Sequence, residues 1–379
     1  MDIINQVFDI CFISMSDIST DARTINFAKT FAKNSKKVCV ISYCSNKDII
    51  KFSKNNILLL PVPKPLYKKA FLKTYHFQKW IKNNYTNIKA KNYWAEDIYS
   101  LYPASKLSKV HKGKLIYDSR EIYSALGPLH RNPFKQKVLS RFEKRLIKYV
   151  NEIVVTGVMD AEYLKEYFQK DIPVHVVQNL PYYKEKINSN ILREKYGIPQ
   201  DKFIIIYQGM LLPGRGIIKI VEALNHLPDA VFCILGEGNY KNKILETAEN
   251  LKLANKVFFC GVVPYYELHK WTSSADVGTV FIEPISFSYE LSLPNKLFEY
   301  CMARIPSLVS DLPAMRAVLN EYPIGKIISV ESTAEDIANT IRELASNEKK
   351  EQYLKACNQA SKIFCYETQE EKILSIAKV

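Results

Sequence analysis

Thirteen short apolar segments rich in β-branched residues alternate with longer helical segments along the whole chain. Near-continuous apolar strands that alternate with helices are typical of parallel sheets covered on both faces. The pattern therefore predicts an α/β protein. The predicted strands are Val7–Ser14, Val38–Tyr43, Ile57–Val62, Asn92–Ala95, Lys114–Tyr117, Ile153–Thr156, Val174–Val177, Phe203–Gln208, Ala230–Leu235, Val257–Phe259, Val277–Phe281, Ser307–Val309 and Lys326–Ser329.

A break in this pattern separates the first seven strands from the last six. The segment Gln178–Asn190 contains Pro181 and two tyrosines, and a new helix and strand follow it. A chain of 379 residues is also longer than one typical domain. We therefore expect two parallel-sheet domains, at 1–180 and 181–363. Parallel sheets bind ligands at the carboxyl ends of their strands, so we expect the site between the two domains.

Positive charge is concentrated in the first predicted domain. The net charge is +14, and residues 1–180 hold 30 Lys and Arg against 15 Asp and Glu. The remaining residues hold 23 basic and 24 acidic side chains. This asymmetry favours an anionic partner, either a membrane surface, an anionic glycan or nucleic acid. A general bias toward Lys would raise the charge of both halves, and no recognised nucleic-acid motif accompanies the charge, so we expect no nucleic acid partner.

The cysteines and the beginning of the sequence predict a cytoplasmic protein. Eight cysteines are scattered without a C-x-x-C pair, mostly inside apolar segments, which favours reduced core residues and disfavours a zinc site. The segment from Met1 to Ser16 lacks a basic region and carries two aspartates, so it is a poor signal peptide. No apolar run approaches the roughly 20 residues that span a bilayer.

Two glycine-rich loops follow neighbouring predicted strands. Gly209, Gly214 and Gly216 come after the strand that ends at Gln208, and a helix is predicted from Ile217. Glycines let backbone N–H groups approach an anion, the helix N-terminus adds partial positive charge, and Arg215 adds a full charge. Gly236 and Gly238 follow the next strand. Each loop alone is compatible with an ordinary turn, but two of them at adjacent strand ends predict a shared site suited to a diphosphate.

The segment Leu293–Tyr300, with the sequence LPNKLFEY, predicts the start of another helix. Pro294 and Asn295 are typical of a helix N-terminus, and Lys296 and Glu299 share one helix face because they are three residues apart. Lys296 is suited to bind a phosphate while Glu299 accepts hydrogen bonds from hydroxyl groups. The spacing alone is also compatible with a surface ion pair.

A basic, aromatic-rich helix is predicted at Pro133–Val150. Its apolar side chains recur at i, i+4 steps, and basic residues occupy the remaining positions. An apolar stripe of this kind most often packs on its own sheet. A second basic, aromatic-rich helix at Tyr67–Asn83 adds weight to the alternative, which is reversible docking on an anionic membrane.

Taken in order, these segments resemble the donor domain of the retaining GT-B glycosyltransferases of family four, the glycosyl transferases group 1. The first domain resembles theirs more loosely, and the last helix resembles the family's terminal helix that returns to the first domain, at about 364–379. The resemblance implies two Rossmann-like domains that face a cleft. Its segments are Gly209–Gly216, LGEG at 235–238, FFCGVV at 258–263, ADVG at 275–278, LPNKLFEY at 293–300, PSLVSDLPAMRAVL at 306–319, SDISTDARTINFAKTFAK at 16–33, YDSREIYS at 117–124 and VVQNLP at 176–181.

The resemblance assigns roles to individual residues. Arg215 occupies the position of a phosphate-binding lysine, and Glu299 that of the glutamate that holds the nucleotide ribose. These two and Lys296 are the predicted catalytic residues. The donor-binding candidates are Gly209, Gly214, Gly216, Gly236, Gly238, Leu293, Pro294 and Asn295, with Gly261 and Val263 beside the base. The acceptor-side candidates are Asp21, Arg23, Arg120 and Glu121.

Three positions depart from the family pattern. Met210 replaces a phosphate-binding arginine, Leu291 replaces the first glutamate of the E-x7-E motif, and Arg120 replaces the histidine of D-x-H-E. The last two changes affect contacts to the donor sugar, whereas Lys296 is available to supply a second positive charge in place of the missing arginine.

The resemblance implies transfer of a sugar from a UDP- or GDP-linked donor to a glycan or lipid-linked acceptor in polysaccharide synthesis. It implies retention of configuration, no metal cofactor, and a cytoplasmic or peripheral-membrane location. Two alternatives stay open: a GT-B sugar-nucleotide epimerase and an inactive nucleotide-sugar-binding partner. A nicotinamide oxidoreductase is disfavoured because no G-x-G-x-x-G opens the first βαβ unit.

Overall fold

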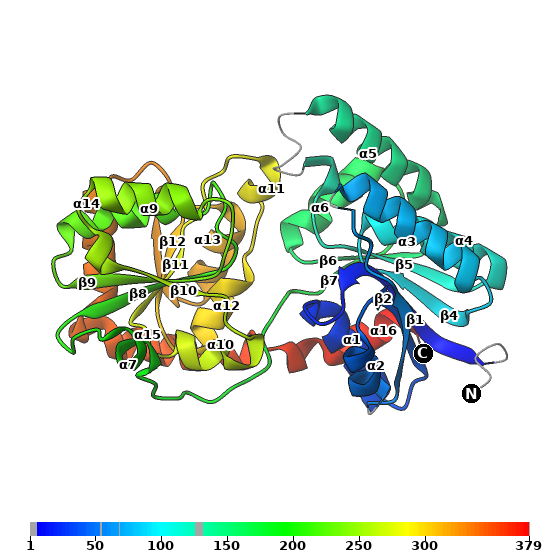
Figure 1. The fold of residues 1–379 in the computed structure, drawn as a ribbon, viewed down its shortest axis with the longest axis horizontal. Coiled ribbons are helices and arrows are strands. Elements are labelled where there is room, and N and C mark those ends of the chain that lie inside the picture. Colours follow the sequence, from blue (N-terminus) through cyan, green and yellow to red (C-terminus); the bar gives the residue numbers. More distant parts are fainter. Residues whose placement is uncertain (1–5, 54, 68, 126–131, 379) are drawn as a thin grey trace. The chain divides into compact units, whose positions relative to one another are not determined.

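The chain divides into two compact units in the computed structural model, which describes residues 6–53, 55–67, 69–125 and 132–378 (Figure 1). Unit 1 comprises Met1–Asn179 with Gln369–Val379, and unit 2 comprises Leu180–Thr368. The sequence placed the boundary after residue 180 and assigned 364–379 to the first domain. In the structure, 364–368 belong to unit 2, because Tyr366 N–H donates to the carbonyl oxygen of Pro181 at 2.8 Å.

Unit 1 is built on a seven-stranded parallel sheet with the strand order β3-β2-β1-β4-β5-β6-β7. The chain order differs from the spatial order, and the reversal of direction at β1 is the switch point where parallel sheets bind ligands. The strands are β1 (Val7–Asp17), β2 (Val38–Tyr43), β3 (Ile57–Val62), β4 (Lys89–Ala95), β5 (Lys114–Ser119), β6 (Glu152–Val155) and β7 (Val174–Val176).

Helices cover both faces of this sheet, as the alternating pattern predicted (Figure 1). On one face lie α1 (Ala22–Lys33), α2 (Asn46–Ser53) and α16 (Glu370–Ala377). On the other face lie α3 (Ala70–Asn84), α4 (Ile98–His111), α5 (Pro133–Leu146) and α6 (Val158–Phe168).

Helix ends explain where the observed elements differ from the predicted ones. Helix α1 begins at Ala22, because the Asp21 side chain accepts a hydrogen bond from Thr24 N–H as the N-cap. The basic helix expected at Pro133–Val150 begins at Pro133, where the Asn132 side chain caps it, but it ends at Leu146. The chain continues from there as a short 3-10 turn, Ile147–Tyr149.

Unit 2 contains a six-stranded parallel sheet with the order β10-β9-β8-β11-β12-β13. Both units are therefore Rossmann-like, as the sequence predicted. The strands are β8 (Phe203–Gln208), β9 (Ala230–Leu235), β10 (Val257–Gly261), β11 (Val277–Val280), β12 (Ser307–Ser310) and β13 (Gly325–Ile328).

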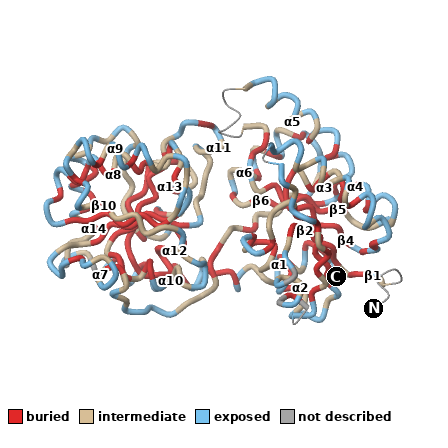
Figure 2. The backbone as a smooth tube through the Cα atoms, viewed as in Figure 1, coloured by how far each residue is buried: buried red, intermediate tan, exposed pale blue. Residues whose placement is uncertain are grey.

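Two apolar clusters cover the two faces of this second sheet, and the strands form the buried centre of the unit (Figure 2). One face is covered by α8 (Ile217–Ala223), α9 (Lys241–Asn250) and α14 (Ala334–Ala345). The other face is covered by α7 (Ile191–Tyr196), α10 (Tyr265–Thr272), α12 (Asn295–Met302), α13 (Pro313–Glu321) and α15 (Asn347–Ile363). The short helix α11 (Phe287–Glu290) lies in the loop between β11 and α12.

Two further sequence expectations bear on location. All eight cysteines are free in the structure, and six of them are buried. Among the described residues, no helix has both the length and the apolar character needed to cross a bilayer.

Candidate functional site

The two glycine loops of unit 2 lie against each other at the carboxyl ends of β8 and β9. Gly209 N–H donates to the carbonyl oxygen of Leu235 at 2.9 Å, and Leu211 N–H donates to that of Glu237 at 3.1 Å. A Cβ atom added to Gly236 would lie 1.9 Å from the carbonyl oxygen of Gly209, so only glycine permits this approach. The prediction that both loops contribute to one surface agrees with this packing.

The first loop turns sharply into helix α8. Gly214 and Gly216 have positive φ values of 76° and 65°, and Gly216 is the N-cap of the helix. A Cβ atom on Gly216 would meet the carbonyl oxygen of Phe281 at 2.5 Å. Because α8 has only seven residues, few peptide dipoles align behind this loop. Ionised side chains therefore supply most of the positive charge at this edge of the sheet.

Two cations lie near this loop without a carboxylate partner among the residues that the structure describes. The guanidinium carbon of Arg215 lies 4.5 Å from the ring centroid of Tyr289, and Lys296 Nζ lies 3.8 Å from that of Tyr207. Aromatic faces attract cations but carry no charge, so neither side chain is neutralised by its ring and both remain available to an anionic partner. This is the arrangement that an anion-binding site requires.

The charge state of Lys296 reflects its surroundings. Its side chain is buried, on the first turn of α12. Burial and, to a smaller extent, the neighbouring Arg215 charge hold the pKa of Lys296 well below its ordinary value, while Glu299 opposes the shift. A bound anion would return the pKa toward the ordinary value, because it favours the charged form of the lysine.

Glu299 lies one turn after Lys296 on α12 and belongs to a polar chain that reaches the end of β8. Gln208 donates a hydrogen bond through Nε2 to the Glu299 carboxylate, and its Oε1 accepts one from Thr272 Oγ1 at 2.8 Å. Burial raises the pKa of Glu299, while this hydrogen bond and the charges of Lys296 and Lys184 oppose the increase. The carboxylate is therefore positioned by its neighbours and remains half-buried.

The remaining donor-side candidates surround these groups. Leu293 directly precedes Pro294, which is the N-cap of α12. The backbone N–H groups of Asn295 and Lys296, in the first turn, therefore have no partner inside the helix. Gly261 ends β10 with a φ of 71°, and its carbonyl oxygen accepts from Gly236 N–H at 2.8 Å. Val263 packs against the core. Gly238 places its Cα close to the backbone of Leu211.

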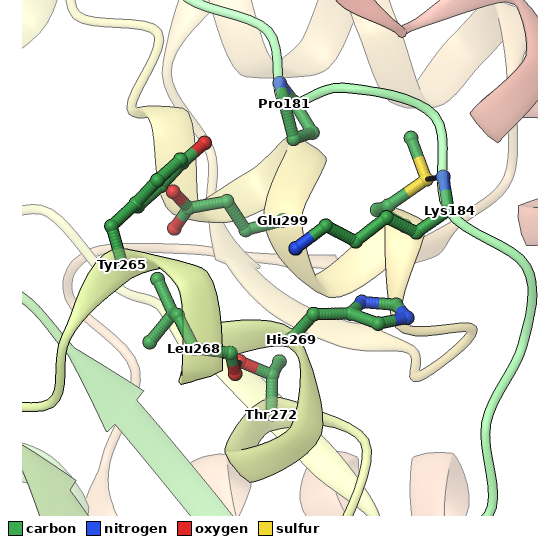
Figure 3. A pocket seen from close by; sticks show the side chains of 8 residues that line it. Pro181, Lys184, Tyr265, Leu268, His269, Thr272 and Glu299 are labelled. Atoms are coloured by element: carbon green, nitrogen blue, oxygen red, sulfur yellow. Dashed lines mark hydrogen bonds between the residues drawn. The ribbon is translucent and has the colours of Figure 1, made fainter. Parts of the chain in front are cut away.

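Glu299 also lines a small pocket that the sequence did not predict (Figure 3). Helix α10 contributes Tyr265, Leu268, His269 and Thr272, and the other walls are Pro181, Lys184, Glu299 and Met302. No sequence motif marks the polar residues of this pocket, which are Lys184 and the side chains of α10. No motif marks Gln208 either, although it ends a predicted strand. Lys184 lies in the segment Gln178–Asn190, where the sequence indicates only a break between the two predicted domains.

The acceptor-side candidates meet in a buried charge network at the carboxyl ends of β1 and β5. Arg23 donates two hydrogen bonds to Asp118, at 2.7 and 3.0 Å, and further ones to the Val177 carbonyl oxygen and to Asn179. Asp21 accepts from Ser14 Oγ at 2.9 Å. Asp21 and Arg23 are only 6% and 9% exposed, so they hold the network together rather than face solvent.

Arg120 connects the network to an acid that the sequence analysis missed. It donates to Asp21 at 3.0 Å and also pairs with Glu96, which directly follows β4. Burial raises the pKa of Glu96 well above its ordinary value, although Arg120 opposes the shift. Glu96 Oε1 is buried, and no described residue forms a hydrogen bond with it. Glu121, by contrast, is exposed. The two acids Glu96 and Asp97 at a strand end were the signal that the sequence analysis did not use.

The sequence and the fold are similar to those of known glycosyltransferases. Residues 188–361 match the family model described as glycosyl transferases group 1. Over 62% of this chain and 55% of its own length, the chitobiosyldiphosphodolichol beta-mannosyltransferase of Candida albicans is 26% identical. The lipopolysaccharide 1,2-N-acetylglucosaminetransferase of Salmonella typhimurium is 21% identical over 62% of this chain and 64% of its own length. The chain thus spans less than two thirds of the length of these curated relatives.

A solved structure has the same fold over nearly the whole chain. The structure of HepE from Anabaena in complex with UDP and glucose superposes with a TM-score of 0.77. The two are 14% identical, and the match covers 97% of this chain and 98% of that one. Two parallel-sheet units with this topology define the class of GT-B glycosyltransferase folds.

Within that class, residues 188–361 of this chain are similar to the glycosyl transferases group 1, whose family model they match. The structure confirms the fold that the sequence predicted, and the match of residues 188–361 agrees with the predicted family resemblance. The roles of individual residues, the stereochemistry and the acceptor remain predictions.

Proposed function

We propose that this chain transfers a sugar from a nucleotide diphosphate sugar, UDP- or GDP-linked, to a glycan or lipid-linked acceptor in surface polysaccharide synthesis. One observation supports this most strongly. Arg215 and Lys296 flank the glycine loops on aromatic rings, and no described carboxylate pairs with either. Glu299 lies one helical turn beyond Lys296 on α12, and we assign it to the ribose of the donor.

In the proposed reaction, the bond between the anomeric carbon and the diphosphate breaks, and the leaving diphosphate gains negative charge. Fixed cations stabilise that charge more in the transition state than in the ground state, by several kcal/mol. Arg215 and Lys296 are the groups we assign to this task. Because they supply the positive charge, we propose a reaction that does not depend on a metal ion. Full turnover in the presence of EDTA is the expected result.

We further propose that the configuration at the anomeric carbon is retained. Attack from the same face as the leaving group would let the departing phosphate oxygen accept the proton of the acceptor hydroxyl. The support for this is the resemblance of the donor-site segments to retaining enzymes. NMR of the product formed from an α-linked donor is the test, because a β-linked product would contradict retention.

The acceptor is assigned to unit 1, which carries the basic excess. Helix α5 presents Phe134 and Val138 to solvent beside basic side chains, while Leu139 and Phe142 pack on the core. Exposed Phe71 and Tyr75 lie near the start of α3, in the same layer. Each Lys or Arg near an anionic leaflet contributes about 1 kcal/mol, so a few suffice for reversible docking. We therefore propose a cytoplasmic protein that docks on anionic membranes through unit 1.

A second candidate function rests on the departures from the family pattern. Met210 is 66% exposed at the position of a phosphate-binding arginine, and Leu291 occupies the position of a glutamate. A chain with these changes would act as an inactive nucleotide-sugar-binding partner if the remaining groups bind the donor without cleaving it.

One experiment separates the two candidates. A thermal-shift panel of nucleotide sugars identifies the donor, and release of nucleoside diphosphate is then measured with that donor and a panel of glycan and lipid-linked acceptors. Acceptor-dependent release supports transfer. Binding without release from any donor would favour the inactive partner, and the absence of any nucleotide-sugar binding would contradict both.

A further inference from the structure

The segment that follows the start of unit 2 is fixed tightly onto its helices. Lys184 N–H donates to Met302 Sδ at 3.1 Å, and the Lys184 carbonyl oxygen accepts from Arg304 Nη2 at 3.2 Å. Arg304 is itself buried and held by Asn358 at 2.7 Å. The backbone of Lys184 therefore has one defined position relative to α12, the helix that carries Glu299.

A histidine on α10 fixes the next residue of the same segment. His269 Nε2 lies 3.0 Å from the carbonyl oxygen of Glu185, and because a carbonyl only accepts, Nε2 must carry the proton. Burial lowers the pKa of His269, with smaller contributions from the Lys184 and Arg304 charges. The imidazole is therefore neutral at pH 7 and adds no charge to the pocket.

The Lys184 side chain extends from this fixed backbone along the pocket wall that faces Glu299 (Figure 3). No hydrogen-bond or ion-pair partner of its ammonium group occurs among the described residues. Burial lowers the pKa of Lys184, and the Glu299 charge opposes the decrease. Positioning a cation without a partner costs free energy, which a ligand that accepts its hydrogen bonds would recover.

The two ends of the pocket differ in hydrogen-bonding character. An ionised carboxylate only accepts, and an ammonium group only donates. A hydroxyl group does both, so a ribose hydroxyl placed between them donates to Glu299 and offers its oxygen to Lys184. We propose that Lys184 completes the ribose site by donating to one of the two ribose hydroxyl oxygens, and that it makes the site selective for ribonucleotides. This inference rests on the proposed function.

The proposal makes Lys184 a specificity-determining residue for the nucleotide, on a segment that shares no motif with the glycine loops. Two readings compete with it. In the first, Lys184 only balances the charge of Glu299, and its removal would weaken all nucleoside diphosphates alike. In the second, Lys184 makes no contact with the nucleotide, and its removal would leave every affinity unchanged.

The test measures dissociation constants by calorimetry for UDP, 2′-deoxy-UDP and 3′-deoxy-UDP, with the guanosine series if GDP binds better. Lys184→Met keeps the length of the side chain and removes the charge. We expect it to weaken the ribonucleotide about 10-fold, within the range for a hydrogen bond to a charged group. Binding of the one deoxy analogue that lacks the contacted hydroxyl should change less than about twofold, so the preference for ribose shrinks by about 10-fold.

A matched control removes a charge from the same segment. Lys186 is exposed and lines no part of the pocket, so Lys186→Met should leave all affinities within about twofold. Equal weakening of the ribonucleotide and both deoxy analogues by Lys184→Met would overturn the proposal, and so would no weakening at all. Wild-type protein that is folded by its thermal transition but binds no nucleoside diphosphate would instead contradict the proposed function itself.

Discussion

Replacing Lys296 with methionine should abolish most of the activity while leaving the fold as stable as before or more stable. Methionine has nearly the same length and is apolar, so it fills the space next to the Tyr207 ring without the charge. In the wild type, the ammonium group is buried, and no described carboxylate forms an ion pair with it, although the charge of Glu299 offsets part of its cost. A residue that serves only the fold would have the opposite signature, because its removal would lower stability.

The structure sets the size of both effects. Loss of one positioned donor to a developing anion costs about 100-fold in turnover, which corresponds to about 2.7 kcal/mol. Removal of the buried charge gains about 1.4 kcal/mol for each unit by which the pKa of Lys296 lies below its usual value. The lost contact with the Tyr207 ring offsets about 0.5–2 kcal/mol of that gain. We therefore expect unchanged or higher stability at neutral pH.

The pH dependence of stability separately tests whether Lys296→Met stabilises the protein. Below its lowered pKa, Lys296 is charged in both the folded and the unfolded protein, so the full cost of burying the charge lowers the stability. Between the lowered pKa and the ordinary pKa, folded Lys296 binds fewer protons than the unfolded lysine, and this cost decreases. That cost disappears as the pH rises toward 10.5, the ordinary pKa of a lysine. The stability gained by Lys296→Met should thus be largest at acidic pH and vanish at strongly alkaline pH.

Two measurements suffice for this prediction. Chemical unfolding at several pH values gives the stability of the variant and the wild type, and release of nucleoside diphosphate from the identified donor gives turnover. Near-normal turnover in Lys296→Met would refute the assignment to the leaving group. A loss of stability that parallels the loss of turnover would show that the lysine is structural.

Three other outcomes are expected. Arg215→Ala should also lower turnover about 100-fold without unfolding the protein, and near-normal activity would remove Arg215 from the mechanism. Glu299→Gln should weaken nucleoside diphosphate binding by about 1–3 kcal/mol in calorimetry, whereas unchanged affinity would indicate a structural role. Flotation should show salt-sensitive binding to anionic but not neutral vesicles. The double variant Lys137→Glu and Arg141→Glu on α5 should weaken that binding at least about 10-fold. The control double variant Lys355→Glu and Lys362→Glu on α15 should not weaken it. Equal flotation with both lipids at low salt would contradict membrane docking.

The sheets and the glycine loops could be predicted because their signals are local. β2, β3, β8 and β9 have the bounds that their apolar runs predicted. The central strands β8 and β9 are almost entirely buried, and a glycine directly follows each of them. The order and spacing of the segments from Gly209 to Glu299 also predicted the family resemblance, which agrees with the match of residues 188–361 to the family model. Positive φ at Gly214 and Gly216 is the kind of constraint that leaves a mark in the sequence.

The rest of the candidate site could not be predicted because it depends on contacts between distant segments. Lys184 and Thr272 are 88 residues apart, yet they line one pocket with Glu299. The stripe on α5 shows the same limit. Phe134 and Phe142 have equivalent positions in the i, i+4 pattern, but Phe134 is exposed, whereas Phe142 packs on the core beside Tyr102 of α4.

Arg120 stands where the resembling family has a histidine, and the surrounding side chains compensate for the added charge. An arginine in a buried position requires carboxylates, and Asp21 and Glu96 accept from this one. Glu96 in turn needs the arginine, because burial favours its protonated form and Arg120 opposes that effect. The guanidinium group is therefore fixed at the carboxyl ends of the strands, with its side chain still 19% exposed. From the sequence alone, Arg120 in place of the histidine suggests a lost contact. In the structure, the same residue is a rigid hydrogen-bond donor that is always charged.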